Sequence, residues 1–259
     1  MPVAKPPTIA ELEIHRVVSP REWLAERRQL LRKEKELTRL NDELSAMRRE
    51  LPWVKVEKEY VFDTPDGKRT LADLFEGRSQ LIVYHFMFGP GWTEGCDGCS
   101  FLSDHFDGPN LHLPHHDVML TVVSRAPLEE FLPFKKRMGW KFTWVSSNDS
   151  DFNYDFHASS SKEAVKTGKI LYNFEEIDSA DAGKEHHGIS VFYRNAKEEI
   201  FHTYSCYSRG VDILCGTHNL LDLTPKGRNE KGTMDWVRPH DRYEEVAGKA
   251  GDCCVSTEE

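Results

Sequence analysis

Two cysteines separated by two residues form the most reactive pair in this sequence. Cys96 and Cys99 lie in the segment GCDGCS at residues 95–100. Two thiols with this spacing at the start of a helix can reach each other and form a disulfide, and the thiolate is the nucleophile in disulfide exchange. We therefore predict a dithiol redox centre in which Cys96 attacks a substrate disulfide and Cys99 resolves the mixed disulfide.

The surroundings of Cys96 are expected to tune its acidity. A helix that begins at the pair places backbone N–H groups and the positive end of its dipole beside the Cys96 sulfur, which favours the thiolate. Asp97 places a negative charge next to the same sulfur. We expect this charge to raise the pKa of Cys96 and to make the pair a reductant more than an oxidant.

Three further residues are candidates for the same site. Trp92 lies beside the cysteine loop, where it could cover the disulfide and bind substrate or simply pack. Thr93 comes three residues before Cys96, and Arg125 follows a predicted strand at the same sheet edge. A thiol peroxidase would need such a hydrogen-bond donor and such a cation, whereas a surface salt bridge is the alternative for Arg125. A peroxiredoxin-like thiol peroxidase therefore remains open beside disulfide exchange.

Metal binding is the other chemistry open to these cysteines. Zinc could be held by Cys96, Cys99, His105 and one of three further histidines, namely His112, His115 or His116. Structural zinc sites usually take their second ligand pair from a compact motif, and these histidines are scattered. We favour redox chemistry and expect neither a metal nor a cofactor. A metal or iron–sulfur site and a non-enzymatic interaction module are the alternatives.

Four more cysteines occur in the chain. We interpret Cys206 and Cys215 as thiols of the hydrophobic core. Cys253 and Cys254 stand in a polar tail, where they could relay electrons to the main pair or have no role.

The cysteine pair follows a predicted central strand. Residues 80–88 form an almost continuous apolar run, typical of a strand buried on both faces of a parallel sheet, and we interpret its His85 as a core histidine. The breakers GPG at residues 89–91 end this strand. A strand, a helix and a strand are then predicted at residues 118–124, 128–138 and 141–146. The pair therefore belongs at the carboxyl end of a central strand.

The rest of the domain is predicted from shorter patterns. Residues 147–187 are polar and are expected to form an irregular insertion. Hairpins and helices are predicted at residues 58–67, 72–75, 189–204 and 209–221.

A long amphipathic helix precedes the domain. It is predicted to begin at Pro20 and to end near Glu50. An apolar stripe with steps of three and four follows one face, formed by Leu37, Leu40, Leu44, Met47 and Leu51 and continued upstream by Trp23 and Leu30. Such a stripe must face an apolar surface. We expect it to lie on the protein's own globular body, with a homodimer contact as the alternative.

The composition is that of an ordinary globular protein. Of its 259 residues 39% are hydrophobic and 30% charged, and the net charge is −9. A negative surface repels phosphates, which disfavours nucleic acid and anionic membranes as partners. The longest apolar run, residues 81–88, is too short to span a bilayer. Prolines near the start stand where a secretory signal needs an apolar core, so we expect a cytoplasmic protein.

Several of these segments together resemble a known family. Residues 60–84 resemble the opening of peroxiredoxin-like and membrane-tethered thioredoxin-like proteins. A bacterial family of thioredoxin-like proteins, described as predicted dithiol-disulfide oxidoreductases, is similar at residues 86–92, 95–101, 123–128 and 222–228. The resemblance implies a thioredoxin-like α/β fold, with a central mixed sheet flanked by helices, and thiol-disulfide chemistry at Cys96 and Cys99. The resemblance does not name the substrate; from the chemistry of the cysteine pair we expect a disulfide or peroxide substrate and a thiol electron donor as partners.

The pattern of elements along the chain sets the expected domain limits, and the chain departs from thioredoxins at one position. A leader and helical arm span residues 1–52, the thioredoxin-like domain 53–223 and an irregular tail 224–259. Thioredoxins carry a cis-proline before the strand that faces the active site, whereas this chain has the sequence GISV at residues 188–191. We expect Ser190 to occupy that place and to line the substrate groove.

Overall fold

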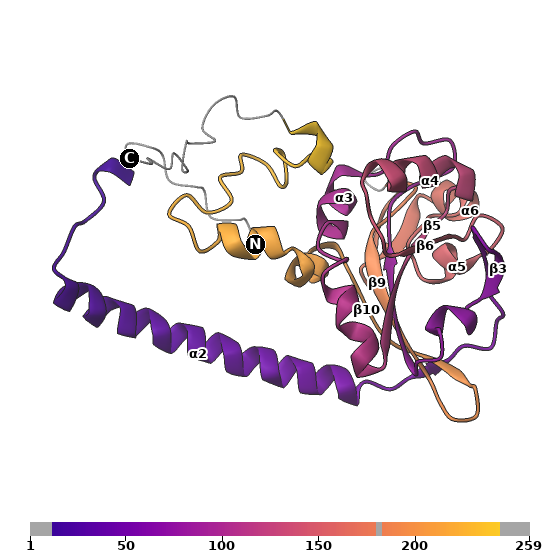
Figure 1. Ribbon diagram of the computed structural model, residues 1–259, viewed down its shortest axis with the longest axis horizontal. Coiled ribbons are helices and arrows are strands. Elements are labelled where there is room, and N and C mark those ends of the chain that lie inside the picture. Colours follow the sequence, from indigo (N-terminus) through magenta and orange to yellow (C-terminus); the bar gives the residue numbers. More distant parts are fainter. Residues whose placement is uncertain (1–11, 180–182, 244–259) are drawn as a thin grey trace, which may run out of the picture.

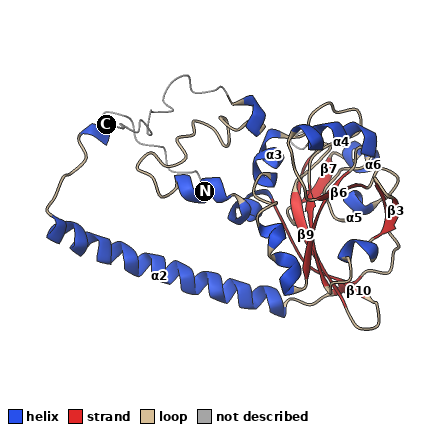
Figure 2. Cartoon of the chain, viewed as in Figure 1, coloured by secondary structure: helices blue, strands red, loops and turns tan. Residues whose placement is uncertain are grey.

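The computed structural model describes residues 12–179 and 183–243. Its centre is an eight-stranded mixed sheet with the strand order β1-β10-β9-β4-β5-β6-β2-β3. Helices flank this sheet, as the cartoon in Figure 2 shows. The predicted α/β class, with a central mixed sheet flanked by helices, is confirmed.

The middle of the sheet is the predicted β-α-β-α-β unit. Strand β4 pairs in parallel with β5, which pairs in parallel with β6, and α3 and α4 make the two connections. Their bounds are Gln80–His85 for β4, Asp97–Ser103 for α3, Val118–Ser124 for β5, Leu128–Arg137 for α4 and Thr143–Ser146 for β6. The carboxyl ends of these parallel strands meet at one edge, which is where α3 begins.

The remaining strands extend the sheet on both sides. β9 is antiparallel to β4 and forms with β10 the predicted hairpin, and β2 and β3 form the predicted N-terminal hairpin. These strands and the edge strand β1 span Gly188–Arg194 (β9), Ile200–Tyr207 (β10), Val61–Thr64 (β2), Gly67–Thr70 (β3) and Val54–Lys55 (β1). Short 3-10 helices lie at Asp73–Phe75, Pro109–Leu111, Leu113–His116 and His240–Arg242.

Each face of the sheet has its own hydrophobic core. Tyr84 and Ile189 point to the face that α3 and α4 cover, where they pack with Trp144. Val83 and Phe192 point to the opposite face, into a second buried cluster. This follows from the two-residue repeat of a strand, and it decides which strand residues can reach the cysteines.

The insertion is more ordered than predicted. Instead of an irregular stretch, residues 147–187 contain two short helices and a separate two-stranded sheet. The elements are α5 (Phe152–Asp155), α6 (Lys162–Lys166), β7 (Lys169–Tyr172) and β8 (Glu175–Asp178). The apolar pattern of so short a segment was too sparse to predict them, although Phe152 and Phe156 are buried under the sheet.

The predicted closing helix is interrupted. A 3-10 helix at Ser208–Leu214 is followed by α7 (Gly216–Leu221), and the break falls at the buried Cys215. At Gly216 a Cβ atom would lie 3.0 Å from Cδ2 of His105, so the chain comes close to the end of α3 here.

The N-terminal arm is the helix α2 (Pro20–Glu50), which agrees with its predicted bounds. Ser19 caps it through a reciprocal capping box with Glu22, and the proline after Leu51 prevents its extension. Figure 1 shows α2 projecting from the body. None of its residues is buried, and Leu37 is 58% exposed. The prediction that the stripe lies on the protein's own body is therefore wrong.

The described residues contain no helical membrane span. No helix there combines the length and the apolar character needed to cross a bilayer.

Candidate functional site

The cysteine pair lies where the chain leaves the central strand β4 and starts α3. Cys96 is the N-cap residue of α3 and is partly buried, whereas Cys99 in the first turn is 2% exposed. Both are free thiols in the structure. Cys96 is thus partly accessible, whereas Cys99 lies in the core.

The backbone of one residue, Met87, contacts both cysteines. The carbonyl of Met87 accepts a hydrogen bond from the backbone N–H of Cys96 at 3.2 Å, and the N–H of Met87 donates to Sγ of Cys99 at 3.4 Å. Ser100 closes the first turn, because both its N–H and its hydroxyl donate to the carbonyl of Cys96 at 2.9 Å. The loop between β4 and α3 is therefore tied to the strand end it leaves.

Gly95 allows this loop to pack closely. A Cβ atom at this position would lie 2.5 Å from Cε1 of Phe86 and 3.1 Å from Cε1 of Phe134. Both rings are buried, so neither can move aside without disturbing the core. Only glycine fits before Cys96 in this arrangement.

Cys96 is an acidic thiol in this environment. Its pKa is lowered from 9.0 to about 6, first because the thiol of Cys99 donates a hydrogen bond to its sulfur. Backbone N–H groups of Cys99 and Gly98 act in the same direction, against the opposing effect of burial. The Asp97 charge raises the pKa, as expected, but it is the smallest of these effects. At neutral pH the Cys96 thiolate therefore predominates.

Cys99 has the opposite character. Burial raises its pKa well above 9.0, and the neighbouring Cys96 thiolate raises it further. Two donors partly offset this effect, namely the hydroxyl of Tyr84 and the N–H of Met87. Tyr84 is 1% exposed, and its ring packs against Phe86 and Phe106. Sequence reasoning missed Tyr84, although it is the strand residue on the face of β4 that α3 covers.

The candidates next to Cys96 lie on the surface around it. Trp92 is 38% exposed, with its ring near Phe88, and Thr93 and Asp97 are exposed. The structure thus places these three around the cysteine loop and gives none of their side chains a hydrogen bond to either sulfur.

Arg125 is engaged elsewhere. Its Nε donates to Oε1 of Glu185 at 2.8 Å, and its Nη2 contacts the same oxygen. Glu185 is 3% exposed and also accepts a hydrogen bond from Ser159 at 2.5 Å. A Cβ atom at Gly89 would lie 3.2 Å from Oε1 of Glu185, so this ion pair supports the loop that leads to the cysteines. The guanidinium of Arg125 therefore pairs with a buried carboxylate near this loop.

The structure does not bring Ser190 to the cysteines. Ser190 pairs with Val83 across the sheet and points to the face opposite α3. Its hydroxyl lies 2.9 Å from Nε2 of His85 and 3.0 Å from Oγ of Ser205. The expectation that it lines a groove beside Cys96 misjudged the register, because a shift of one residue moves a side chain to the other face. His85 itself is fully buried, and burial lowers its pKa to about 3.

The zinc alternative finds no support in the arrangement of the histidines. Within the described ranges no three residues of metal-binding type come together as a cluster. His105 follows the C-terminal end of α3. It forms a hydrogen bond with Thr217, whose hydroxyl lies 2.9 Å from Nε2 of His105. The structure therefore does not place His105 with Cys96 and Cys99.

The other cysteines are separate from the pair. Cys215 is buried in the core, and burial raises its pKa to about 11. Cys206 is partly buried and faces an apolar cavity of about 600 Å³ on the α3 side of the sheet. This cavity also contains His105 in its wall, so it lies toward the end of α3 that is farther from Cys96. Cys253 and Cys254 lie outside the described residues.

The protein-family comparison matches almost the whole chain. Residues 12–243 fit the model of a family described as bacterial protein of unknown function, DUF899. The chain belongs to this family. The matched range of the DUF899 family includes the helical arm, the cysteine pair and the described C-terminal segment. No curated protein matches the chain.

Solved structures resemble this DUF899 protein only in part. PrxQ from Xylella fastidiosa is 12% identical, with a TM-score of 0.41, and the match covers 62% of this chain and 88% of that one. Peroxiredoxin Q from Xanthomonas campestris is also 12% identical, with a TM-score of 0.41, and the match covers 62% of this chain and 90% of that one. Peroxidoxin BcpB from Mycobacterium tuberculosis is 11% identical, with a TM-score of 0.39, and the match covers 64% of this chain and 95% of that one.

Proposed function

We propose that this protein is a thiol-disulfide oxidoreductase that uses Cys96 as nucleophile and Cys99 as resolving thiol. The observation that carries the proposal is that two neighbouring thiols differ in exposure and in acidity. Cys96 is partly exposed and has a pKa lowered to about 6, whereas Cys99 is buried behind it and stays protonated. A thiolate near the surface with a protected thiol in contact is what two-step disulfide exchange requires.

In the first step the Cys96 thiolate attacks one sulfur of a substrate disulfide. A bond forms between Sγ of Cys96 and that sulfur, the substrate S–S bond breaks, and the other substrate sulfur leaves as a thiolate that takes a proton from water. The hydrogen bonds from Cys99 and from the backbone N–H groups hold the attacking thiolate ready.

In the second step Cys99 resolves the mixed disulfide. Once Cys96 has reacted it carries no negative charge, so one cause of the raised pKa of Cys99 is removed. The hydrogen bonds from Tyr84 and Met87 then favour the Cys99 thiolate. Cys99 attacks Sγ of Cys96, the bond between Cys96 and the substrate sulfur breaks, and that sulfur leaves as a thiol that takes up the proton lost by Cys99. The Cys96–Cys99 disulfide that forms holds the two oxidising equivalents of the substrate disulfide. An external dithiol restores the reduced pair.

The proposal is tested by redox titration of the protein against dithiothreitol, followed by alkylation and mass analysis of Cys96 and Cys99. We expect a single two-electron couple for the pair. Cys96→Ser should abolish turnover of disulfides, and Cys99→Ser should accumulate the mixed disulfide on Cys96. Cys206→Ser is the matched control, since this partly buried thiol lies away from the pair, and it should retain turnover.

Two results would contradict the proposal. One is the absence of a Cys96–Cys99 couple in the titration, and the other is turnover that survives Cys96→Ser. A hydroperoxide is tested as a parallel substrate. If the protein reduces hydroperoxide but no disulfide, the thiol-peroxidase alternative replaces the proposed function.

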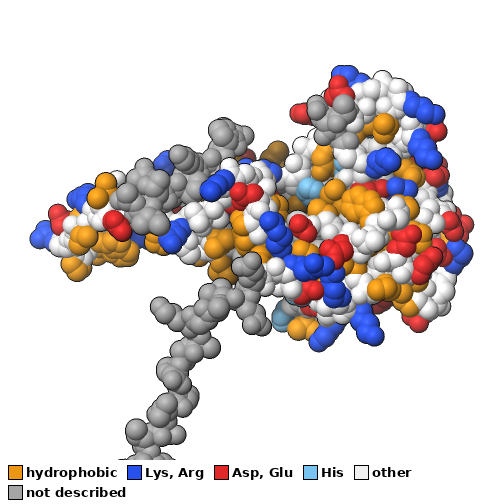
Figure 3. Space-filling view, turned by 90° about the horizontal axis from the view of Figure 1, so that it is seen from above, with side chains coloured by type: hydrophobic (Ala, Val, Ile, Leu, Met, Phe, Trp, Pro, Cys, Tyr) orange, Lys and Arg blue, Asp and Glu red, His pale blue; other side chains and the backbone are white. Residues whose placement is uncertain are grey.

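We also propose that the exposed stripe of α2 binds a second copy of the chain. Hydrophobic side chains gather along the projecting part of the molecule (Figure 3). Leu37 and Leu44 are seven residues apart and therefore occupy equivalent heptad positions. In the same register Glu43 and Arg48 lie on the two sides of the stripe, five residues apart. In a parallel, in-register pair each Glu43 faces the Arg48 of the other copy, which is the charge pattern that favours a parallel coiled coil.

A further inference from the structure

Part of the described C-terminal segment packs on the globular body. Residues 234–242, which we call the strap, lie beside α3 (Figure 1). A Cβ atom at Gly98 would lie 3.4 Å from Cε and 3.6 Å from Sδ of Met234, and 3.9 Å from Sγ of Cys96. Gly98 separates the two cysteines, so Met234 and the Cys96 sulfur border the same point of the α3 surface.

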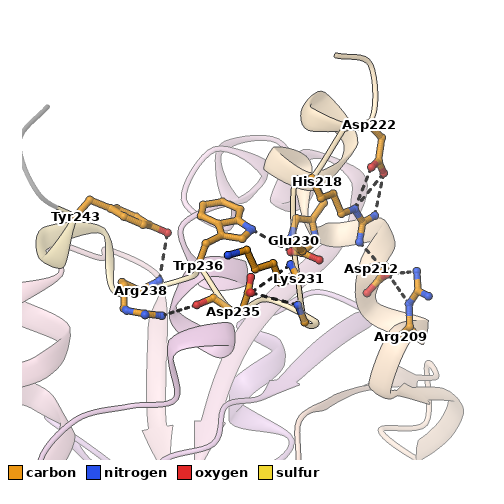
Figure 4. Close-up of polar contacts among 12 residues, drawn as sticks. Arg209, Asp212, His218, Asp222, Glu230, Lys231, Asp235, Trp236, Arg238 and Tyr243 are labelled. Carbon is orange, nitrogen blue, oxygen red and sulfur yellow. Dashed lines mark hydrogen bonds and ion pairs between the residues drawn. The ribbon is translucent and has the colours of Figure 1, made fainter. Parts of the chain in front are cut away.

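Hydrophobic contacts anchor the middle of the strap. Val237 is 1% exposed and belongs to the core cluster that contains Cys99. Trp236 packs edge-on against Phe101 of α3, with a distance of 5.6 Å between the ring centroids. Its Nε1–H donates to Oε1 of Glu230 at 3.0 Å, and His218 also faces this carboxylate (Figure 4).

Charged contacts hold the end of the strap at the cysteine loop. Asp241 pairs with Nε of Arg137 on α4 at 2.9 Å, and Arg242 pairs with Glu94. Arg137 also binds Glu94, at 2.5 Å. Glu94 stands two residues before Cys96, so this network connects the strap directly to the loop that carries the nucleophile.

A third polar contact joins the strap to the other end of α3. Nδ1 of His240 lies 2.7 Å from Oδ1 of Asp104, the C-cap residue of α3. The strap is thus attached to α3 near its first turn, along its side and at its end. A side chain added at Gly98 would meet it, and so would any chain that approached Cys96 from that side.

We infer that the strap restricts Cys96 to disulfides of low molecular weight and excludes disulfides of folded proteins. A protein substrate must place several residues of backbone beside the attacked sulfur, and Met234 occupies this surface next to Cys96. A small disulfide needs only the partly exposed sulfur itself. This inference rests on the proposed function, and it makes Met234, Asp241 and Arg242 determinants of substrate size.

The test compares two substrates, oxidised glutathione and insulin, with the full chain and an external dithiol as reductant. The wild-type protein should reduce oxidised glutathione with much the higher kcat/KM. Met234→Ala and the double variant Asp241→Ala/Arg242→Ala should each raise the insulin-to-glutathione ratio of kcat/KM by about tenfold or more. Lys231→Ala, an exposed change just before the strap, is the matched control and should leave the ratio unchanged.

A second measurement tests access to Cys96 without turnover. The rate of alkylation by iodoacetamide is compared with that by a maleimide coupled to a small folded protein. The strap variants should increase the rate of Cys96 alkylation by the bulky maleimide at least about tenfold and change the rate of alkylation by iodoacetamide little.

The outcomes separate the two proposals. If the wild-type protein reduces insulin as well as oxidised glutathione, or if both strap variants leave the substrate ratio and the alkylation ratio unchanged, the inference about the strap is overturned while the redox function stands. If neither disulfide is reduced and the titration shows no Cys96–Cys99 couple, the proposed function fails and the inference about substrate size falls with it.

Discussion

At the scale of single residues the acidity of Cys96 is the property that matters most. Asp97 raises its pKa, but hydrogen bonds from Cys99 and from backbone N–H groups outweigh that charge. A stabilised thiolate also stabilises the reduced form of a dithiol, which shifts the couple toward oxidising behaviour. The expectation of a reductant rested on Asp97 alone, and the local geometry acts against it.

The pH dependence of Cys96 reactivity follows from this pKa. We expect its alkylation rate by iodoacetamide to rise with pH around a midpoint near 6 and to level off above it, because only the thiolate reacts. Asp97→Asn should move the midpoint to lower pH, since it removes a negative charge that opposes the thiolate. The measurement is a pH series of alkylation rates by mass spectrometry, with Cys96→Ser as the blank. A midpoint near the value of a free cysteine, about 8.5, would contradict the assigned environment.

At the scale of elements the molecule consists of a scaffold and an arm. The loop from β4 to α3 is held by buried contacts, whereas α2 exposes an entire apolar stripe. A helix capped at Ser19 can persist alone, but an exposed row of leucines indicates a partner.

Disruption of this stripe should dissociate the proposed dimer. Leu37→Glu/Leu44→Glu places charges on the seam of both copies and removes about 1.5–3 kcal/mol of burial per leucine. We therefore expect the dimer dissociation constant, measured by sedimentation equilibrium, to increase by at least about a hundredfold. Arg39→Glu lies off the stripe and serves as the control. A wild-type protein that stays monomeric throughout the concentration series would show that the stripe has a different partner.

At the scale of the whole molecule a buried ion pair joins the insertion to the sheet. Glu185 lies in the chain that returns from the insertion, and it binds Arg125 after β5 and Ser159 within the insertion. Its side chain is 2% exposed and that of Arg125 is 20% exposed. The same carboxylate lies near the loop before the cysteines, since a Cβ atom at Gly89 would lie 3.2 Å from its Oε1.

Loss of this carboxylate should destabilise the fold. Glu185→Ala leaves the largely buried Arg125 without its carboxylate partner. We expect the free energy of unfolding to fall by about 3 kcal/mol. This value is the lower end of the range for a broken buried ion pair, because Arg125 retains some exposure. Urea denaturation measures this value. Glu175→Ala, an exposed change in the same insertion, should stay within about 0.5 kcal/mol of the wild type. An equal effect of the two substitutions would show that the ion pair has no special structural role.

The sequence by itself determined the features that depend on local pattern. The capping box at Ser19 and the proline after Leu51 bound α2, and unbroken apolar runs marked β4 and β5. The breakers after β4 and the spacing of Cys96 and Cys99 placed the pair at a strand end. These signals lie within a few residues of one another, so neighbouring side chains suffice to predict them.

Only the tertiary structure decided the features that depend on which face and which distant segment meet. The register of the strands places Ser190 on the sheet face opposite the cysteines and Tyr84 on the face of Cys99. No local sequence pattern shows which face a residue of a strand buried on both sides will occupy. The exposure of the α2 stripe and the placement of Met234 at Gly98 depend on how segments far apart in the chain pack. The sequence therefore predicted a reactive cysteine pair, and packing determined its acidity, its buried partner and the strap that borders it.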